Sequence, residues 1–142
     1  MLVSQILKAK GDLVFTATPS ETVSAICALL HSRRVGAMII MDGDRVAGIV
    51  SERDVVRVMA EQGASALNQP VSSCMTRDVV FAEPGETVNS LLSRMTDRRL
   101  RHLPVCEGDR LIGIVSIGDL VKHKISEVEA EADGLKAYIA AG

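Results

Sequence analysis

Two serine–aspartate pairs are the residues of this sequence whose types and spacing could form a binding site. Ser51 and Asp54 make the first pair, and Ser116 and Asp119 make the second pair, 65 residues further along the chain. A serine followed three residues later by an acid is typical of a helix N-terminus, where both side chains bond backbone N–H groups. The same helix end attracts anions. The pattern therefore predicts two helix caps, each of which can also take part in ligand binding.

Basic side chains suited to phosphate accompany the pairs. Arg53 lies inside the first pair, and Arg101 and His102 lie in the second half of the chain. An arginine can donate two parallel hydrogen bonds to phosphate oxygens. The alternative for Arg53 is a surface ion pair with Glu52 or Asp97, a common fate of an exposed charge. The second pair encloses isoleucine and glycine instead of glutamate and arginine, so we expect its surroundings to be less positive.

Patterns for catalysis or metal binding are absent from the sequence. Cys27, Cys74 and Cys106 stand far apart, which argues against disulfides or a zinc site and favours buried or inert thiols. We interpret His31 and His123 as surface or helix-end residues, with His123 near the end of its helix. No nucleophile elbow or glycine-rich phosphate loop is present either. We therefore expect no catalytic residue, no metal and no enzyme activity.

Composition excludes several classes of protein. The 16 basic and 18 acidic residues give a net charge of −2, and the only aromatic residues are Phe15, Phe81 and Tyr138. A nucleic-acid binder needs positive charge and stacking platforms that this chain lacks. The N-terminus does not resemble a signal peptide, and apolar runs such as residues 37–41 are too short to span a membrane. These features predict a soluble, cytoplasmic protein with neither nucleic acid nor membrane as partner.

The sequence contains an internal repeat. When residues 14–57 are aligned without gaps to residues 79–122, 17 of the 44 positions are identical, including the glycine–isoleucine–valine–serine run that precedes each aspartate. A tandem duplication of this kind predicts two similar units arranged about a pseudo-twofold axis, each covering the apolar face of the other.

Each copy predicts the same order of elements, β-α-β-β-α. A first strand leads to a helix that we expect to begin at Pro19 or Pro84, because proline suits the first helical position, with a capping box from Thr18 to Glu21 in the first copy. Two strands joined by a glycine turn follow, and a second helix begins after Ser51 or Ser116. The expected strands are residues 14–16, 37–41 and 45–50 in the first copy and residues 79–81, 103–106 and 110–115 in the second copy.

Apolar residues at helical spacing predict which faces of the first helices are buried. They are Val23, Ile26, Cys27 and Leu30 in the first copy and Val88, Leu91, Leu92 and Met95 in the second copy. Gly48 and Gly113 stand inside strands, where glycine lowers stability. They indicate a bulge, tight packing, or close approach of a ligand or of the other copy, and the sequence does not separate these alternatives.

The remaining segments are a connection and a tail. Residues 62–73 read as the connection between the copies. In the tail, residues 126–142, an apolar stripe that begins at Ile125 and includes Leu135 and Ile139 predicts a helix, which Gly134 weakens.

The doubled unit resembles a pair of CBS domains, a family named after cystathionine β-synthase. The resemblance rests on the two runs Gly-Ile-Val-Ser-x-x-Asp at residues 48–54 and 113–119, on Ser-Cys-Met-Thr at residues 73–76 and on Arg-His-Leu-Pro-Val at residues 101–105. It implies one module over residues 1–142, with the first motif at residues 3–62, the second at residues 70–125 and a helical tail. The implied fold class is α/β (α+β).

The resemblance also implies what such a protein binds. CBS pairs bind adenosine ligands in two clefts, where the aspartate chelates the ribose hydroxyls and the helix N-terminus faces phosphate, and each cleft combines residues of both copies. The first cleft would contain Ser51, Arg53, Asp54, Val79, Val80, Arg101, His102, Leu103 and Pro104. The second cleft would contain Val14, Phe15, Thr16, Gly36, Ala37, Ser116 and Asp119.

The implied function is therefore a stand-alone regulatory module that senses adenosine nucleotides, with AMP as the first choice and ADP, ATP or NAD as further ones. We expect the Asp54 cleft to bind phosphorylated ligands more tightly. Family members commonly pair again through their helices, so we also expect a homodimer, extended by the apolar stripe of the tail, and an unidentified protein partner. The alternative is a dimeric interaction protein that regulates a partner without a nucleotide.

Overall fold

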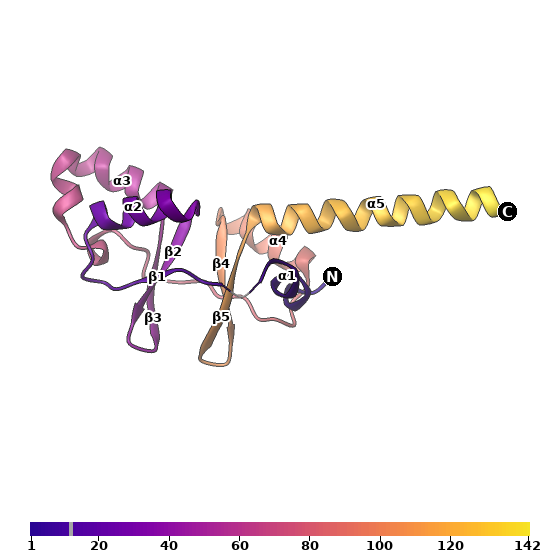
Figure 1. Ribbon diagram of the computed structural model, residues 1–142, viewed down its shortest axis with the longest axis horizontal. Coiled ribbons are helices and arrows are strands. Elements are labelled where there is room, and N and C mark those ends of the chain that lie inside the picture. Colours follow the sequence, from indigo (N-terminus) through magenta and orange to yellow (C-terminus); the bar gives the residue numbers. More distant parts are fainter. Residues whose placement is uncertain (12) are drawn as a thin grey trace. The chain divides into compact units, whose positions relative to one another are not determined.

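The computed structural model describes residues 1–11 and 13–142 and divides the chain into two compact units (Figure 1). Unit 2 consists of Leu13–Val80 and Gly108–Ile112, and unit 1 consists of Met1–Asp12, Phe81–Glu107 and Gly113–Gly142. The mixed helix and strand composition confirms the predicted α/β class. The elements are α1 (Val3–Lys10), β1 (Thr16–Ala17), α2 (Val23–Arg33), β2 (Ala37–Asp42), β3 (Arg45–Ser51), α3 (Glu52–Gln62), the 3-10 turns η1 (Gly63–Asn68) and η2 (Val71–Ser73), α4 (Val88–Arg98), β4 (His102–Glu107), β5 (Arg110–Ser116) and α5 (Ile117–Ala141).

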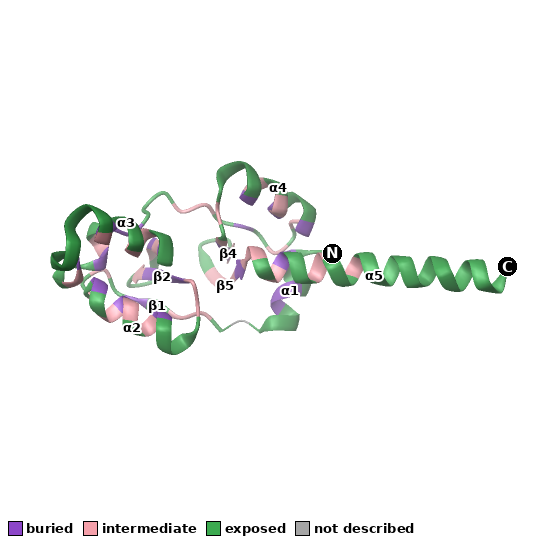
Figure 2. Cartoon of the chain, turned by 90° about the horizontal axis from the view of Figure 1, so that it is seen from above, coloured by how far each residue is buried: buried purple, intermediate pink, exposed green. Residues whose placement is uncertain are grey.

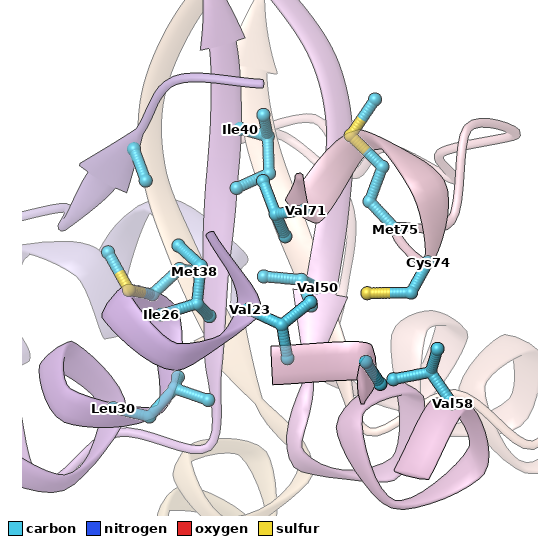
Figure 3. Close-up of a cluster of buried hydrophobic side chains, with 12 residues drawn as sticks. Val23, Ile26, Leu30, Met38, Ile40, Val50, Val58, Val71, Cys74 and Met75 are labelled. Atoms are coloured by element: carbon cyan, nitrogen blue, oxygen red, sulfur yellow. The ribbon is translucent and has the colours of Figure 1, made fainter. Parts of the chain in front are cut away.

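Unit 2 is built on a three-stranded sheet in the order β1-β2-β3. β2 pairs parallel with β1 and antiparallel with β3, with the register of β2 and β3 shifting between Ile40 and Met41. One side of the sheet and the helices α2 and α3 enclose the core of this unit (Figure 3). Its buried side chains are Ala17, Val23, Ile26, Leu30, Met38, Ile40, Val50, Val58, Ala66, Val71, Cys74 and Met75.

Unit 1 repeats this plan with the β4–β5 hairpin. Its buried side chains are Val3, Ile6, Leu7, Ala82, Val88, Leu91, Met95, Leu103, Val105, Val115 and Leu120. The predicted stripes on α2 and α4 are confirmed, because three of the four residues in each are buried, and Cys27 and Leu92 are half-buried. The two hairpins likewise occupy the predicted residues within one position at each end.

The segments that lead into the two copies are exchanged between the units. In unit 2 the N–H of Val23 donates to the carbonyl of Gln69, at 2.9 Å, and in unit 1 the N–H of Val88 donates to the carbonyl of Met1, at 3.0 Å. The lead-in of the second copy therefore packs on the first copy, and α1 packs with the second copy. The sequence repeats and the compact units consequently have different boundaries.

The first helix of each copy begins later than predicted. α2 begins at Val23 and α4 at Val88, because Thr22 and Thr87 are the capping residues, and each accepts a 3.1 Å hydrogen bond from the backbone N–H three residues on. Pro19 and Pro84 lie in the turn before the helix. Glu21, predicted to complete a capping box with Thr18, accepts from the Thr18 N–H at 2.7 Å within that turn. The prediction of a helix starting at proline is therefore wrong by four residues.

The first strand of each copy is also shorter than predicted. β1 covers only Thr16 and Ala17, and residues 79–81 form no strand; the second copy keeps a single parallel bridge between Ala82 and Val105. This bridge is the counterpart of the pairing of Ala17 with Ile40. The two Ala side chains are buried, whereas residues 79–81 are half-buried or exposed, so burial selects the later residues for pairing.

The predicted tail helix is present, but as a continuation of the helix that follows Ser116. α5 runs for 25 residues without a break at Gly134. Beyond Leu120 it carries no buried residue and extends past the other elements of unit 1 (Figures 1 and 2). Among the described residues, no helix is both long and apolar enough to cross a lipid bilayer.

Candidate functional site

The serine–aspartate pairs cap the helices α3 and α5, as predicted. The side-chain oxygens of Ser51 and Ser116 accept from the backbone N–H of Asp54 and Asp119, at 3.3 and 3.1 Å. In return, each aspartate accepts from the backbone N–H of its serine, at 2.9 Å. Both are therefore reciprocal capping boxes that fix the carboxylates at the helix N-termini.

A further hydrogen bond ties the start of each helix to the residue that precedes the first strand of the hairpin, β2 or β4. The N–H of Glu52 donates to the carbonyl of Gly36, at 3.0 Å, and the N–H of Ile117 donates to the carbonyl of Arg101, at 2.8 Å. Ala37 is also the pairing partner of Ser51. Gly36 and Ala37, predicted for the second cleft, therefore lie beside the serine–aspartate pair of the first. Arg101, predicted for the first cleft, lies beside the serine–aspartate pair of the second.

The Asp54 carboxylate is held on both oxygens. Besides the backbone bond, Oδ2 accepts from the Ser51 hydroxyl at 3.1 Å. Oδ1 accepts from Nη2 of Arg57 at 3.2 Å and from the hydroxyl of Thr76 at 3.3 Å. Arg57 also donates to the carbonyl of Cys74 at 2.9 Å, so it links α3 to the exchanged lead-in segment. Asp54 is therefore oriented by its own helix and by the lead-in of the second copy.

The Asp119 carboxylate has a different partner. Nζ of Lys10 donates to Oδ2 of Asp119 at 2.7 Å and to the carbonyl of Ile114 at 3.0 Å. Burial alone would raise the pKa of Asp119, but the hydrogen bonds from Lys10 and Ser116 outweigh that effect and lower the pKa. Asp119 therefore stays ionised at any pH near neutrality. The expectation of a less positive environment here missed the Lys10 ammonium.

Arg53 is free to meet an anion. Its side chain is exposed, and it forms no ion pair or side-chain hydrogen bond with any other described residue, so the alternative of pairing with Glu52 or Asp97 is not realised. Its backbone N–H, in the first turn of α3, also donates to no other described group. Asp54 thus has two arginines near it in sequence. Arg57 is hydrogen-bonded to Asp54 and Cys74, whereas the Arg53 side chain is bonded to no other described residue.

The two strand glycines are explained by close packing of the lead-in segments. A Cβ at Gly48 would lie 2.8 Å from both Sδ of Met75 and the carbonyl oxygen of Thr76. A Cβ at Gly113 would lie 2.6 Å from Cδ2 of Leu7. Of the alternatives that the sequence left open, the structure therefore shows close approach of another protein segment at both positions. Gly48 also lies beside a register shift, because it pairs with Ile40 and the next pair is Met41 with Val46.

The other predicted residues differ in how accessible they are. Leu103 and Pro104 are buried in unit 1, whereas Arg101 is exposed and His102 is half-buried. In unit 2, four predicted residues are half-buried, namely Val14, Phe15, Val79 and Val80, and Thr16 is exposed. The guanidinium carbon of Arg33 lies 4.9 Å above the centre of the Phe15 ring. Because Leu103 is buried in the core, a ligand would contact more accessible neighbours such as Arg101.

An open hollow adjoins Gly36. It has a volume of about 590 Å³ and lies between the C-terminal end of α2 and the N-terminal end of α3. Its lining residues are Leu30, His31, Ser32, Arg34, Val35, Gly36 and Glu52. Most of its surface is polar or charged, so His31 stands at a polar edge of unit 2, consistent with its interpretation as a surface residue.

Sequence reasoning missed three residues that touch the aspartates: Lys10, Arg57 and Thr76. Arg57 had a usable signal, because it lies three residues after Asp54 and therefore on the same face of the helix. Lys10 and Thr76 reach their aspartates only through the exchange of lead-in segments, and no local pattern encodes that exchange.

No metal site or disulfide accompanies these helix ends. Within residues 1–11 and 13–142, no group of three metal-ligating side chains is present, and none of the three cysteines forms a disulfide. Burial raises the pKa of the Cys74 thiol, with the nearby Asp54 charge acting in the same direction. A protonated thiol is a poor nucleophile and a poor ligand, which agrees with the interpretation of Cys74 as an inert core residue.

Known proteins match this chain over most of its length. The family model of the CBS domain matches twice, at residues 11–61 and 71–126. The chain is 32% identical over 149 aligned residues to the CBS domain-containing protein CBSX3, mitochondrial, of Arabidopsis thaliana, covering 99% of this chain and 72% of that protein.

Solved structures agree with that match. A CBS-domain-containing protein of Agrobacterium tumefaciens superposes with a TM-score of 0.86 at 41% identity, covering 87% of this chain and 99% of the other. The CBS domain pair of protein MJ0100, solved in complex with 5-methylthioadenosine and S-adenosyl-L-methionine, superposes with a TM-score of 0.79 at 22% identity, covering 89% of this chain and 98% of the other. With two matched motifs, a duplicated fold and capped helices at the same place in both copies, this chain belongs to the CBS domain family.

Proposed function

We propose that this protein is a regulatory module that binds an adenosine-containing ligand through Asp54 and Asp119. The observation that carries the proposal is the duplicated position of these carboxylates, each fixed by a capping box at a helix N-terminus and only partly exposed, with 14% of the Asp54 side chain and 27% of the Asp119 side chain accessible. A partly desolvated carboxylate is a strong acceptor for a pair of hydroxyl groups. The adjacent N–H groups suit an anionic group of the same ligand.

Each carboxylate keeps an oxygen that a ribose hydroxyl can reach. Oδ1 of Asp119 accepts no hydrogen bond from another described residue. Among the residues that the structure describes, Oδ1 of Asp54 accepts from two side chains, Arg57 at 3.2 Å and Thr76 at 3.3 Å. These distances exceed those of strong charge-assisted hydrogen bonds, about 2.7 to 2.9 Å, so a ligand hydroxyl can replace Thr76 at little cost.

The two sites are proposed to differ in their preference for phosphate. Arg53 has no partner among the described residues and can turn to a phosphate beside Asp54. Lys10 would have to give up Asp119 and the carbonyl of Ile114 before it could bind phosphate. The Asp54 site should therefore favour phosphorylated ligands, with AMP first and ADP, ATP or NAD as further candidates, and the Asp119 site should favour ligands with an uncharged or cationic 5′ group.

The comparisons support the ligand class. Protein MJ0100 was solved with two adenosine derivatives, 5-methylthioadenosine and S-adenosyl-L-methionine, and neither carries a phosphate. Ligands of this kind match the preference proposed for the Asp119 site, and they belong in any panel of ligands tried on this protein.

A thermal-shift panel tests the proposal. A ligand that binds only the folded protein at one hundred times its dissociation constant adds about 2.7 kcal/mol to the free energy of unfolding. AMP, ADP, ATP, NAD and S-adenosylmethionine should therefore raise the melting temperature of the protein, whereas GMP and GTP at equal concentration should raise it less. A panel in which no adenosine compound shifts the melting temperature would refute the proposal.

A second candidate function is a nucleotide-independent interaction protein that regulates a partner. It is favoured by one observation, the exposed apolar side chains along α5. An absent thermal shift with every adenosine ligand, together with retention of a specific protein partner, would favour this function over ligand sensing. In either case we propose a non-catalytic, cytoplasmic protein, so incubation with ATP should yield no ADP or AMP.

A further inference from the structure

Helix α5 carries a regular apolar seam that the binding function does not use. Apolar residues recur along it at alternating intervals of four and three residues: Val121, Ile125, Val128, Ala132, Leu135 and Ile139. The five large side chains among them are 42% to 67% exposed. Alternating intervals of this kind give a period of 3.5 residues, the spacing of the a and d positions of a coiled coil.

The seam faces away from the body of unit 1. α5 packs against α1 and α4, and the residues on its packed side are Leu120, which is buried, and His123, Lys124 and Glu127, which are half-buried. Val121, Ile125 and Val128 lie on the other side of the same turns and are exposed. Unit 1 therefore holds the first turns of the helix in place, and the large side chains of the seam remain exposed.

Charged residues flank the seam in a pattern that selects a partner. Ile125, Ala132 and Ile139 take the a positions, and Val121, Val128 and Leu135 take the d positions. The g positions then hold Lys124, Glu131 and Tyr138, and the e positions hold Lys122, Glu129 and Lys136. In a parallel pair of helices, a g residue faces the e residue five positions later in the partner. Lys124 then faces Glu129 of the partner subunit and Glu131 faces Lys136 of the partner subunit, so every such contact is attractive and occurs twice.

The opposite orientation is disfavoured by the same charges. An antiparallel pair in full overlap stacks residue 125 on residue 135 and residue 128 on residue 132, and it brings e beside e and g beside g. Glu129 would then face Glu129 of the partner subunit, and Glu131 would face Glu131 of the partner subunit. Like charges at these positions specify against that pairing.

We propose that α5 forms a parallel, in-register two-stranded coiled coil with α5 of a second copy of this chain. The seam from Val121 to Ile139 has 19 residues and a length of about 28 Å at the rise of an α-helix. Helices this short are marginal when isolated, but α5 is continuous with a folded unit. Because α5 is already helical before two copies associate, less conformational entropy is lost when the dimer forms.

Disulfide trapping tests the orientation and the register. In a background with Cys27, Cys74 and Cys106 changed to alanine, Leu135→Cys should oxidise to a covalent homodimer, because the two copies of residue 135 meet in one d layer. Ser126→Cys, at an outer position of the same helix, is the matched control and should cross-link much less. Equal cross-linking of both variants would overturn the proposal. Preferential coupling of Leu135→Cys to Ile125→Cys in a mixture would overturn the parallel register.

Charge reversal tests the flanking pairs. Glu131→Lys replaces two attractive contacts of the dimer by two repulsive ones and should raise the dimer dissociation constant by about tenfold in sedimentation equilibrium. Asp133→Lys makes the same change of charge two residues away, outside the e and g positions, and should change the dissociation constant little. Adding Lys136→Glu to Glu131→Lys should restore dimerisation. Equal effects of Glu131→Lys and Asp133→Lys, without rescue, would contradict the proposed pairing.

Discussion

At the scale of single residues, the two aspartates are equivalent in sequence but differ in their surroundings. Both complete the same capping box, yet Asp54 is contacted by Arg57 and Thr76, and Asp119 by Lys10. The capping boxes were predictable from the four-residue pattern alone. Arg57 was within reach of the same local reasoning, because it lies one helical turn after Asp54. Thr76 and Lys10 were not predictable, because they belong to segments that are distant in sequence from the carboxylates they contact. The difference between the sites is thus a product of the fold, built on a symmetric motif.

The Lys10–Asp119 ion pair should make stability depend on pH. Lys10→Met should lower the free energy of unfolding at pH 7 by about 1 kcal/mol, since the pair is partly exposed and screened by solvent. The folded protein lowers the pKa of Asp119, so the unfolded chain binds the extra proton first as the pH falls. The contribution of the pair is therefore complete above about pH 5 and is lost on acidification through about pH 4 and below.

Urea unfolding of the wild-type protein and of Lys10→Met between pH 3 and pH 7 measures this effect. The difference in unfolding free energy should shrink toward acidic pH. Lys8→Met is the control, because Lys8 is an exposed residue of the same helix and should show no such trend. A difference that stays constant over the whole pH range would show that the ion pair has no part in stability.

Alanine substitutions at the two strand glycines, Gly48 and Gly113, should lower the free energy of unfolding by different amounts. Gly48→Ala should lower the free energy of unfolding by about 1 to 3 kcal/mol, because the new methyl group would meet the backbone carbonyl of Thr76, which cannot rotate away. Gly113→Ala should cost less, since it meets only the terminal methyl groups of Leu7. Gly85→Ala, with open space around it, is the neutral control. Chemical denaturation orders the three variants, and a larger loss for Gly113→Ala would contradict the packing described here.

At the scale of elements, helix faces, hairpins and the capped starts of α3 and α5 were predictable, and the starts of α2 and α4 were not. Periodicity identified the buried stripes of α2 and α4, and the glycine turns located both hairpins. The helix starts were misplaced because Pro19 and Pro84 satisfy the same rules as a first helical residue, while Thr22 and Thr87 provide the actual caps. Gly134 was expected to weaken the tail, yet α5 continues through it, since Ala, Lys, Glu and Leu around it favour a helix.

The helix ends offer a prediction about backbone strain. α2 and α4 both end in an arginine with left-handed backbone geometry, Arg34 at a φ of 54° and Arg99 at a φ of 55°. Glycine adopts this geometry without steric cost. Arg34→Gly and Arg99→Gly should each raise the free energy of unfolding by about 0.5 to 1 kcal/mol.

Thermal and urea denaturation would detect that gain. Arg98→Gly is the matched control, because Arg98 is the last residue inside α4 and glycine there should destabilise by about 1 kcal/mol. If Arg99→Gly destabilised the protein as much as Arg98→Gly, the left-handed conformation would not be a source of strain.

At the scale of the whole molecule, the duplication and the fold class followed from the sequence, and the composition of the compact units did not. The 65-residue repeat predicted two similar motifs, and the two matches of the family model confirm the duplication. The predicted first strand of the second copy is reduced to one bridge. The exchange of lead-in segments escaped prediction because it depends on hydrogen bonds such as those of Val23 with Gln69 and of Val88 with Met1. The exchanged segments bring Thr76 to Asp54 and Lys10 to Asp119. Each carboxylate therefore accepts a hydrogen bond from the lead-in segment of the other copy.

Calorimetric titration of AMP into matched variants measures whether Asp54 and Asp119 bind an adenosine ligand. Asp54→Asn keeps an acceptor for the Ser51 N–H but removes the charge, and it should abolish the tighter binding phase, weakening it by at least about tenfold. Asp119→Asn should leave that phase nearly intact. Asp44→Asn and Asp109→Asn, at corresponding turn positions of the two hairpins, should bind AMP like the wild-type protein. If both Asp54→Asn and Asp119→Asn bound AMP as tightly as the wild type, the account would be contradicted.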